Sequence, residues 1–272
     1  MTKDVFDINK WKTEYPFLEK VWELYEKFDK TVDTTKVYSK NYESVCNSIV
    51  KNHVEGNDSH QNFCKKLVRN LGCYTYENEA YNPRKEDCII LYYWIYNSVK
   101  EYIINENLIT QVFYDNYSRW CTYKRKVNCF YHNYYDNFED PVNMLFMDIF
   151  HNNIDIVKQE LVKSNDQNYN GDLQKYICKV IHIYNNMIER YCLKDHDKGE
   201  KRKNTCSMLG IVRYTYDLFL RGELYNNKLI VPYIEDIKEA YSDTCMDPES
   251  NKNKVVAEPK RKRKKKFFRG CP

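Results

Sequence analysis

Cysteine spacing is the feature that most constrains how this chain can fold. Ten cysteines are spread over the first 245 residues, and an eleventh lies in a lysine-rich segment near the carboxyl end. No Cys-x-x-Cys sequence occurs, and an even number of widely spaced cysteines is typical of disulfides formed in an oxidising compartment. The candidates for structural disulfides are Cys46, Cys64, Cys73, Cys88, Cys121, Cys129, Cys178, Cys192, Cys206 and Cys245.

Metal binding and cysteine catalysis fit these cysteines less well. A zinc site could be assembled from Cys121, Cys129 and His132, or from His60 and Cys64, but neither set gives two close ligand pairs. No local sequence distinguishes one cysteine as a nucleophile that would work with a distant histidine. We therefore expect no metal and no cofactor, and inert buried thiols are the remaining alternative for some of the ten.

Other motifs of enzymes are also missing from the sequence. Neither Gly-x-Gly-x-x-Gly nor Gly-Lys-Ser/Thr is present, which disfavours nucleotide-dependent enzymes. His182 lies between two isoleucines on an expected helix, without partners that would make it catalytic. Glu235 and Asp236 are adjacent and point in different directions, so a glycosidase has no support. We expect a protein that is not an enzyme and has no catalytic residues.

Charge and length favour one folded domain with a basic tail. At 272 residues the chain can bury a sizeable core, and we place a helical domain at residues 1–247 and a disordered polybasic tail at 248–272. The net charge is +4, yet residues 260–272 hold eight basic and no acidic side chains, so the remainder carries a formal charge of −4. A mildly acidic body disfavours nucleic acid as a partner.

The apolar residues recur at helical spacing nearly throughout, with no convincing strand or hairpin. The fold class that we predict is all-α, a single multi-helix domain stabilised by disulfides. Pro16 in a first turn, Asp58 or Ser59 as caps, and Gly72 as a stop mark helix ends. The expected helices cover residues 17–28, 42–50, 58–71, 83–103, 109–120, 140–161, 173–192, 206–219 and 232–245.

The helix that begins near Pro83 is apolar almost all round between residues 88 and 96, so we expect it to be the central buried helix. Its tyrosines and Trp94 could form a platform for stacking a ligand, but a stripe at helical spacing is more often core. Two disulfide pairings suggest themselves from the loops. Cys192 and Cys206 flank one loop between helices, and Cys121 and Cys129 flank another, which leaves 15 connectivities for the other six.

A short motif in this central helix resembles a known family. Cys88-Ile-Ile-Leu-Tyr-Tyr93-Trp94-Ile-Tyr96, with Cys64-x-x-Leu-x-x-x-Leu upstream and Tyr-Cys192 downstream, is similar to the Plasmodium interspersed repeat (PIR) superfamily, in particular its Vir branch from vivax malaria. The similarity covers roughly residues 15–245. The ordered motifs, the cysteine spread and a composition biased toward AT-rich codons agree with it. The motif residues are Cys88, Tyr93, Trp94 and Tyr96.

The resemblance implies a helical, disulfide-containing ectodomain of a non-enzymatic variant antigen, exported to the infected red blood cell. Its role would be immune evasion and adhesion to a host cell-surface receptor, and its partner a receptor or an antibody. Loops near residues 53–60, 122–128, 164–172 and 194–205 would carry variation and contact. The alternative is an exported soluble or peripheral protein that its basic tail holds at the inner face of the host membrane.

Membrane topology departs from the pattern of the family. Family members typically continue into a transmembrane helix, whereas the longest apolar run here, residues 88–96, has about half the length needed. The first twelve residues are polar and do not resemble a signal peptide. We therefore expect neither a transmembrane helix nor an amino-terminal signal in this chain. Family members are commonly exported without such a signal, which reconciles its absence with the disulfides.

The basic tail has three interpretations: contact with anionic lipid, a nuclear address, or a solvated segment without a partner. Phe267, Phe268 and an acylated Cys271 would strengthen membrane contact, because stable anchoring needs two signals. Asn57 and Asn116 each begin a sequence that matches the glycosylation pattern. The residues expected to contact lipid are Lys260, Arg261, Lys262, Arg263, Lys264, Lys265, Lys266, Arg269 and Cys271.

Overall fold

The computed structural model confirms the all-helical class for the part of the chain that it describes. That part comprises residues 8–36, 39–53, 58–72, 83–102, 104–122, 128–166, 171–193 and 199–221, with Val231, Ile234 and Cys245. Every regular element within these ranges is a helix. The elements are α1 (Ile8–Glu14), η1 (Pro16–Leu18), α2 (Glu19–Asp29), α3 (Ser39–His53), α4 (Asp58–Leu71), η2 (Lys85–Asp87), α5 (Cys88–Tyr102), α6 (Glu106–Thr122), α7 (Tyr134–Asn137), α8 (Pro141–Asn152), α9 (Ile154–Asp166), α10 (Gly171–Met187), η3 (Ile188–Cys192), α11 (Glu200–Tyr216) and η4 (Asp217–Arg221).

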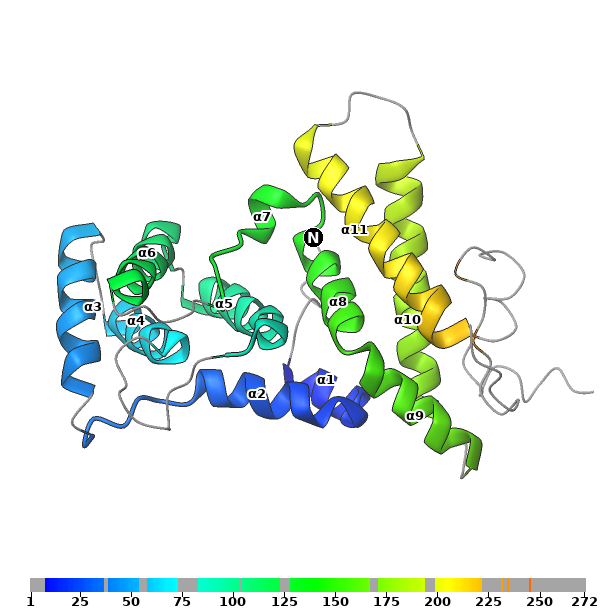
Figure 1. Ribbon diagram of the computed structural model, residues 1–272, viewed down its shortest axis with the longest axis horizontal. Helices are drawn as coiled ribbons and strands as arrows, with labels where there is room; N and C mark the ends of the chain where they lie inside the picture. The colour runs from blue at the N-terminus through cyan, green and yellow to red at the C-terminus, as the bar shows by residue number, and fades with distance from the viewer. Residues whose placement is uncertain are drawn as a thin grey trace, which may run out of the picture.

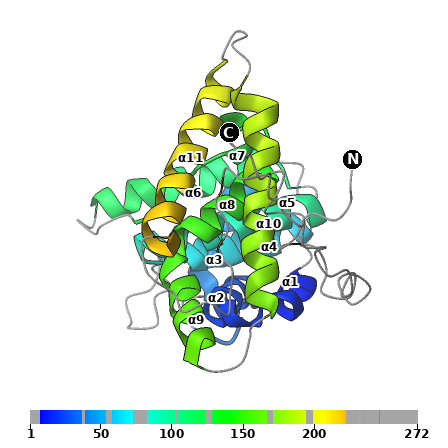
Figure 2. The ribbon, with the colours of Figure 1, turned by 90° about the vertical axis from the view of Figure 1, so that its right-hand side faces the viewer.

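Two groups of helices meet at the middle of the molecule (Figure 1). Helices α3, α4 and α6 contact one another at one end, and α10 and α11 pack against α8 at the other. Helix α5 contacts α2, α4 and α8, and so it joins the two groups. Figure 2 looks onto the second end, where the long helices α10 and α11 face the viewer. One continuous cluster of buried hydrophobic side chains extends from Trp11 to Ile234.

Aromatic rings fill the junction between the two groups. Trp11 of α1 lies edge-on to Phe146 of α8 with ring centroids 4.8 Å apart, and Tyr15 meets Tyr176 of α10 at 4.9 Å. Tyr93 of α5 lies on the other side of Trp11, at 6.1 Å. Such ring pairs add about 0.5–1.5 kcal/mol each beyond their buried area, so this cluster contributes strongly to the contact between α1, α5, α8 and α10.

The motif helix α5 is a structural core. Trp94 is 1% exposed, stacks on Phe63 with centroids 5.3 Å apart, and donates an Nε1 hydrogen bond of 3.1 Å to Asp29. Tyr93, Tyr96 and Cys88 are buried as well. Burial on this scale leaves no open aromatic face on Trp94 or Tyr93 for a ligand, so these two residues belong to the core, whereas Tyr96 also lines a cavity described below.

Several helix boundaries follow the predicted signals. Gly72 ends α4 with a positive φ of 72°, a conformation that glycine adopts without strain. Asp140 caps α8 by accepting a hydrogen bond from the Asn143 amide at 3.3 Å, with Pro141 in the first turn. Helix α3 covers the expected stripe at residues 42–50.

Two helix boundaries were predicted wrongly, and two short helices were missed. The expected helix at 140–161 is two helices, because Asn152 and Asn153 hydrogen-bond back to the Asp148 and Ile149 carbonyls, which competes with continuation of the helix. Helix α11 begins at Glu200, so Cys206 lies inside it rather than at its start. Its polar first turn carries no apolar stripe to detect. Helices α1 and α7 were missed, and the helix expected at 232–245 falls outside the described residues apart from Ile234 and Cys245.

Four disulfides occur among the described residues, and one of the two proposed pairings is confirmed. Cys192 at the end of η3 bonds to Cys206 of α11 across a Cα–Cα distance of 5.7 Å. Cys46 bonds to Cys64, with both side chains fully buried between α3 and α4. The Cα–Cα distance between Cys178 and Cys245 is 5.6 Å.

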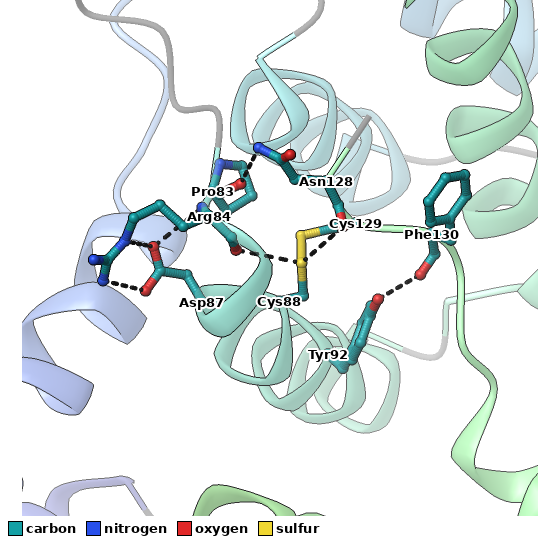
Figure 3. The surroundings of a disulfide bond; sticks show 8 residues. All are labelled: Pro83, Arg84, Asp87, Cys88, Tyr92, Asn128, Cys129 and Phe130. Atoms are coloured by element: carbon teal, nitrogen blue, oxygen red, sulfur yellow. Dashed lines mark hydrogen bonds and ion pairs between the residues drawn. A yellow bond between two sulfur atoms is a disulfide. The ribbon is translucent and has the colours of Figure 1, made fainter. Parts of the chain in front are cut away.

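The proposed Cys121–Cys129 bond is wrong, because Cys129 bonds to Cys88 at the first turn of α5 (Figure 3). The side-chain amide of Asn128 donates a hydrogen bond to the Pro83 carbonyl at 3.0 Å, which brings the segment after residue 127 to the start of α5. Cys121 and Cys129 are close in sequence but are not bonded to each other, because a contact of the tertiary fold brings Cys129 to Cys88. The side chain of Cys121, and all of Cys73, lie outside the described residues.

The disulfides predict the number of reactive thiols. When the oxidised protein is denatured without reductant and treated with a thiol reagent, the eight bonded cysteines should not react. At most three of the eleven, Cys73, Cys121 and Cys271, should be labelled, as intact mass would show. Labelling of six or more would contradict the disulfide framework, and reduction before labelling gives the maximum for comparison.

Candidate functional site

A broad cleft of about 1250 Å³ lies where α1, α5, α8 and α10 meet. Buried rings of Trp11, Tyr15 and Phe146 contribute its apolar part. Charged side chains of α5, α10 and η3 surround them, among them Lys100 and Lys179. Clefts that join an apolar surface to a few polar groups are the usual shape of a binding site.

The charges in this cleft are of both signs and are partly paired. Lys10 lies 3.9 Å from Glu14, and Lys175 lies 3.8 Å from Asp172. Lys100 places its ammonium 4.6 Å from the centre of the Tyr96 ring. Exposed pairs of this kind contribute about 0–1 kcal/mol each, and their mixture gives the cleft no field of a single sign.

A second, smaller cavity of about 160 Å³ lies next to the cleft and shares Tyr96 and Tyr135 with it. We call it the tyrosine cavity, because five tyrosines line it together with Glu106, His132 and aliphatic residues of α5 and α6. The five are Tyr92, Tyr96, Tyr131, Tyr134 and Tyr135. The tyrosine cavity is the candidate site with the more uniform chemistry.

One wall of the tyrosine cavity is formed by residues 131–135, and α5 holds the residues just before this wall, 128–130, in place (Figure 3). The Cys88–Cys129 disulfide fixes one end, and the Tyr92 hydroxyl donates to the Phe130 carbonyl. A disulfide sulfur carries no hydrogen, so the 3.5 Å approach of the Cys88 sulfur to the Asn128 carbonyl is a packing contact.

Glu106 holds the other end of this wall. Its Oε1 accepts hydrogen bonds from the Tyr131 hydroxyl at 3.1 Å and from the Asn133 amide. Asn133 also caps α7, since its Oδ1 accepts from the Tyr135 amide at 2.9 Å. One carboxylate at the start of α6 thus positions three of the residues that line the cavity.

The ionisation states of the lining leave one charged group. Burial raises the pKa of Tyr92 to about 12 and raises the pKa of Tyr96 and Tyr131 further, so the phenols stay neutral. Burial lowers the pKa of His132, although the carboxylate of Asp148 opposes this shift, so the imidazole is neutral at pH 7. Glu106 is therefore the charged side chain of the tyrosine cavity.

A polar cluster behind the cavity centres on Asp148 of α8. Its carboxylate accepts hydrogen bonds from the Tyr134 hydroxyl and, at 2.9 Å, from the Asn152 amide. Burial nevertheless raises the pKa of Asp148 above its ordinary value of 3.8, and the hydrogen bonds and nearby His151 and His132 oppose that shift without overcoming it. The cluster holds α7 against α8, but ionisation of the buried Asp148 carboxyl costs free energy, and this cost depends on pH.

The stability of the Asp148→Asn variant should therefore rise with pH relative to the unmodified protein. A folded-state pKa above 3.8 means that protonated Asp148 stabilises the fold below that pH and that this contribution is lost as the pH rises through the folded-state value. Asparagine stays neutral and avoids the loss. Urea unfolding at pH 4 and pH 7 measures the difference, and a relative stability that falls toward pH 7 would contradict the assignment.

The predicted site residues lie in different environments in the structure. Cys64 and Cys129 are bonded in disulfides, so each zinc alternative loses one thiolate, and no cluster of three metal-ligating side chains occurs within the described ranges. Asn116 is 4% exposed on α6, so its side chain is not accessible to glycosylation. The polybasic tail, Asn57, and half of the residues of the expected contact loops lie outside the described part of the chain.

The lining of the tyrosine cavity was missed by sequence reasoning. Glu106 and Tyr131 are 25 residues apart, and no motif links them. The run Tyr131-His-Asn-Tyr-Tyr135 was visible, but the bias of the whole chain toward tyrosine gave no reason to single it out. Only a prediction that Cys129 bonds to α5 would have brought this run next to Tyr92 and Tyr96.

The geometry defines a class, an all-helical domain braced by disulfides, with a cleft and an aromatic cavity at the junction of two helix groups. We found no matching family model, no similar curated protein and no similar solved structure. Among the described helices, none has both the length and the apolar character required to cross a membrane.

Proposed function

We propose that this chain is a non-enzymatic variant surface antigen of the infected red blood cell, which acts in immune evasion and host-receptor adhesion. The observation that carries this proposal is the set of four disulfides, because disulfides persist in oxidising surroundings such as a cell surface. The resemblance of the Cys88–Tyr96 motif to the PIR superfamily supplies the biological setting.

The organisation of the domain agrees with such a role. Helices and disulfides form the scaffold, and the segments between them are free to vary without disturbing the core. The segment 122–128 follows α6 and precedes the disulfide-bonded Cys129, and the segment 194–205 leads from η3 into α11, between Cys192 and Cys206. Bonds at the ends of these segments fix where they leave the scaffold, which favours their use in recognition.

Protease treatment of intact infected cells tests the surface assignment. Trypsin outside the cell should remove the full-length chain, because Lys124, Arg125 and Lys126 lie in a segment assigned to the exterior. Permeabilised cells provide the control for intrinsic sensitivity to the enzyme. Full protection in intact cells, together with digestion after permeabilisation, would overturn the proposal.

The alternative is an exported soluble or peripheral protein that the basic tail holds at the inner face of the host membrane. The run of seven basic residues from Lys260 to Lys266 favours this alternative, since each contributes about 1 kcal/mol near an anionic surface. Deletion of residues 260–272 should abolish sedimentation with phosphatidylserine vesicles. Unchanged binding would reject the tail as an anchor.

A further inference from the structure

We propose that the tyrosine cavity is a binding site for a quaternary ammonium group, such as the trimethylammonium head of choline. This inference rests on the described residues alone and stands independently of the surface-antigen proposal.

The aromatic lining provides the first argument. A cation near the face of an aromatic ring is attracted by the quadrupole of the ring, and cages of several rings are the usual receptors for quaternary ammonium groups. Five tyrosines line this small cavity, and the rings of Tyr96 and Tyr135 stack with centroids 5.3 Å apart. The ammonium of Lys100 already lies 4.6 Å from the centre of the Tyr96 ring, so the other four tyrosines supply the aromatic surface for a ligand cation.

Charge complementarity provides the second argument. Glu106 is the carboxylate among the lining residues, and Tyr92, Tyr96, Tyr131 and His132 are neutral at pH 7. Within the described part of the chain, its hydrogen bonds from Tyr131 and Asn133 both end on Oε1, which leaves Oε2 for a ligand. A negatively charged cavity of this kind selects a cation over a neutral molecule.

The hydrogen-bonding capacity of the lining narrows the class of cation. The hydroxyls of Tyr92, Tyr131 and Tyr134 already donate to Phe130, Glu106 and Asp148. A primary ammonium needs three acceptors to replace its water, whereas a quaternary ammonium has no N–H and needs none. The cavity offers aromatic surface and one carboxylate, which is the environment that suits the quaternary form.

Size and access fit such a group. A cavity of about 150 Å³ can hold a benzene molecule, which is comparable in size to a trimethylammonium group, and this one measures about 160 Å³. The rim reaches the surface, because Tyr135 is 45% exposed and Glu106 is exposed as well. The adjoining cleft begins at Tyr96 and Tyr135 and leaves room for whatever the ammonium group is attached to.

Titration of the full chain with choline chloride, followed by calorimetry or ligand-observed NMR, tests the proposal. The control ligand is 3,3-dimethylbutan-1-ol, which has the same shape with carbon in place of the charged nitrogen. Choline should bind about tenfold more tightly than the alcohol, since the cation–π attraction is the difference between them. Equal affinities would show that the cavity does not distinguish the charged group from a neutral one, and would overturn the proposal. The absence of saturable choline binding would also overturn it.

Two variants locate the site. Glu106→Gln keeps an oxygen acceptor for Tyr131 and should weaken choline binding about tenfold, whereas Glu101→Gln removes the same charge from an exposed position on α5 outside the cavity. Tyr135→Leu keeps most of the volume but removes a ring, and Tyr114→Leu is its exposed control on α6. Equal effects of Glu106→Gln and Glu101→Gln would place the binding elsewhere and overturn the assignment.

A second arm separates a free ligand from a lipid headgroup. Flotation with phosphatidylcholine vesicles, with and without Glu106→Gln, shows whether the cavity accepts the headgroup in a membrane. Vesicle binding that Glu106→Gln removes would identify a lipid as the source. Choline binding without vesicle binding would identify a soluble ligand, and both results support an ammonium site.

Discussion

Replacement of both Cys88 and Cys129 by alanine should lower the free energy of unfolding by about 4 kcal/mol, the loss expected from opening a loop of this length in the unfolded chain. The bond closes 41 residues, against 14 for Cys192–Cys206. It also anchors the wall of the tyrosine cavity to α5. The double variant should therefore lose choline binding even below its unfolding temperature.

The matched control is the double alanine variant of Cys192 and Cys206. Its expected loss is about 3 kcal/mol, because the loop is shorter, and choline binding should be unchanged because neither cysteine lines the tyrosine cavity. Denaturant unfolding followed by far-ultraviolet circular dichroism measures both. A larger loss for the Cys192–Cys206 pair, or equal effects of the two variants on choline binding, would contradict this account of the wall.

The substitution Arg69→Met should cost about 3 kcal/mol, because it removes several charge-assisted hydrogen bonds of a buried guanidinium, although Asn70 still donates to the Phe28 carbonyl. Arg69 of α4 is 6% exposed, and its guanidinium donates to the carbonyls of Phe28 at 2.8 Å and Thr31 at 3.3 Å. It also donates to the carbonyl of Lys30. These are the unsatisfied carbonyls at the end of α2, where a cation is also favoured by the helix dipole.

The control for Arg69 lies one turn away on the same helix. Lys66 pairs with Asp29 at 2.8 Å, but the Asp29 side chain is 51% exposed and stays hydrated when the pair is broken. Lys66→Met should therefore cost about 1 kcal/mol or less. Similar losses for the two variants in urea unfolding would show that Arg69 acts as a surface charge rather than as the cap of α2.

The sequence was sufficient for the helices that have an apolar face. The stripe of Phe63, Leu67 and Leu71 and the stop at Gly72 reproduce the burial and the end of α4. Helix α1 was missed because seven residues with Trp11 as the one buried side chain give no period to detect. Helix α7 was missed for the same reason, since it is four residues long and is held by the Asn133 cap.

The disulfide pairing and the candidate site could not be predicted from the sequence. Nearness in the chain favoured Cys121 as the partner of Cys129, yet packing of the segment 128–133 against α5 brings Cys129 to Cys88. The same packing gathers Glu106 of α6 with tyrosines from α5 and from residues 131–135. The Glu106–Tyr131 hydrogen bond joins residues 25 positions apart and the Cys88–Cys129 bond residues 41 positions apart, where a local pattern carries no information.

The sequence alone determined the helical class and the burial of α5, because periodicity and capping depend on neighbours within a few turns. The even number of cysteines in the first 245 residues also indicated disulfides. Tertiary structure alone decided which cysteines meet, where Arg69 finds its carbonyls, and that five of the 26 tyrosines surround one carboxylate. The physical reason is that side-chain packing selects among the many arrangements that the same helices allow, and only that arrangement creates a site.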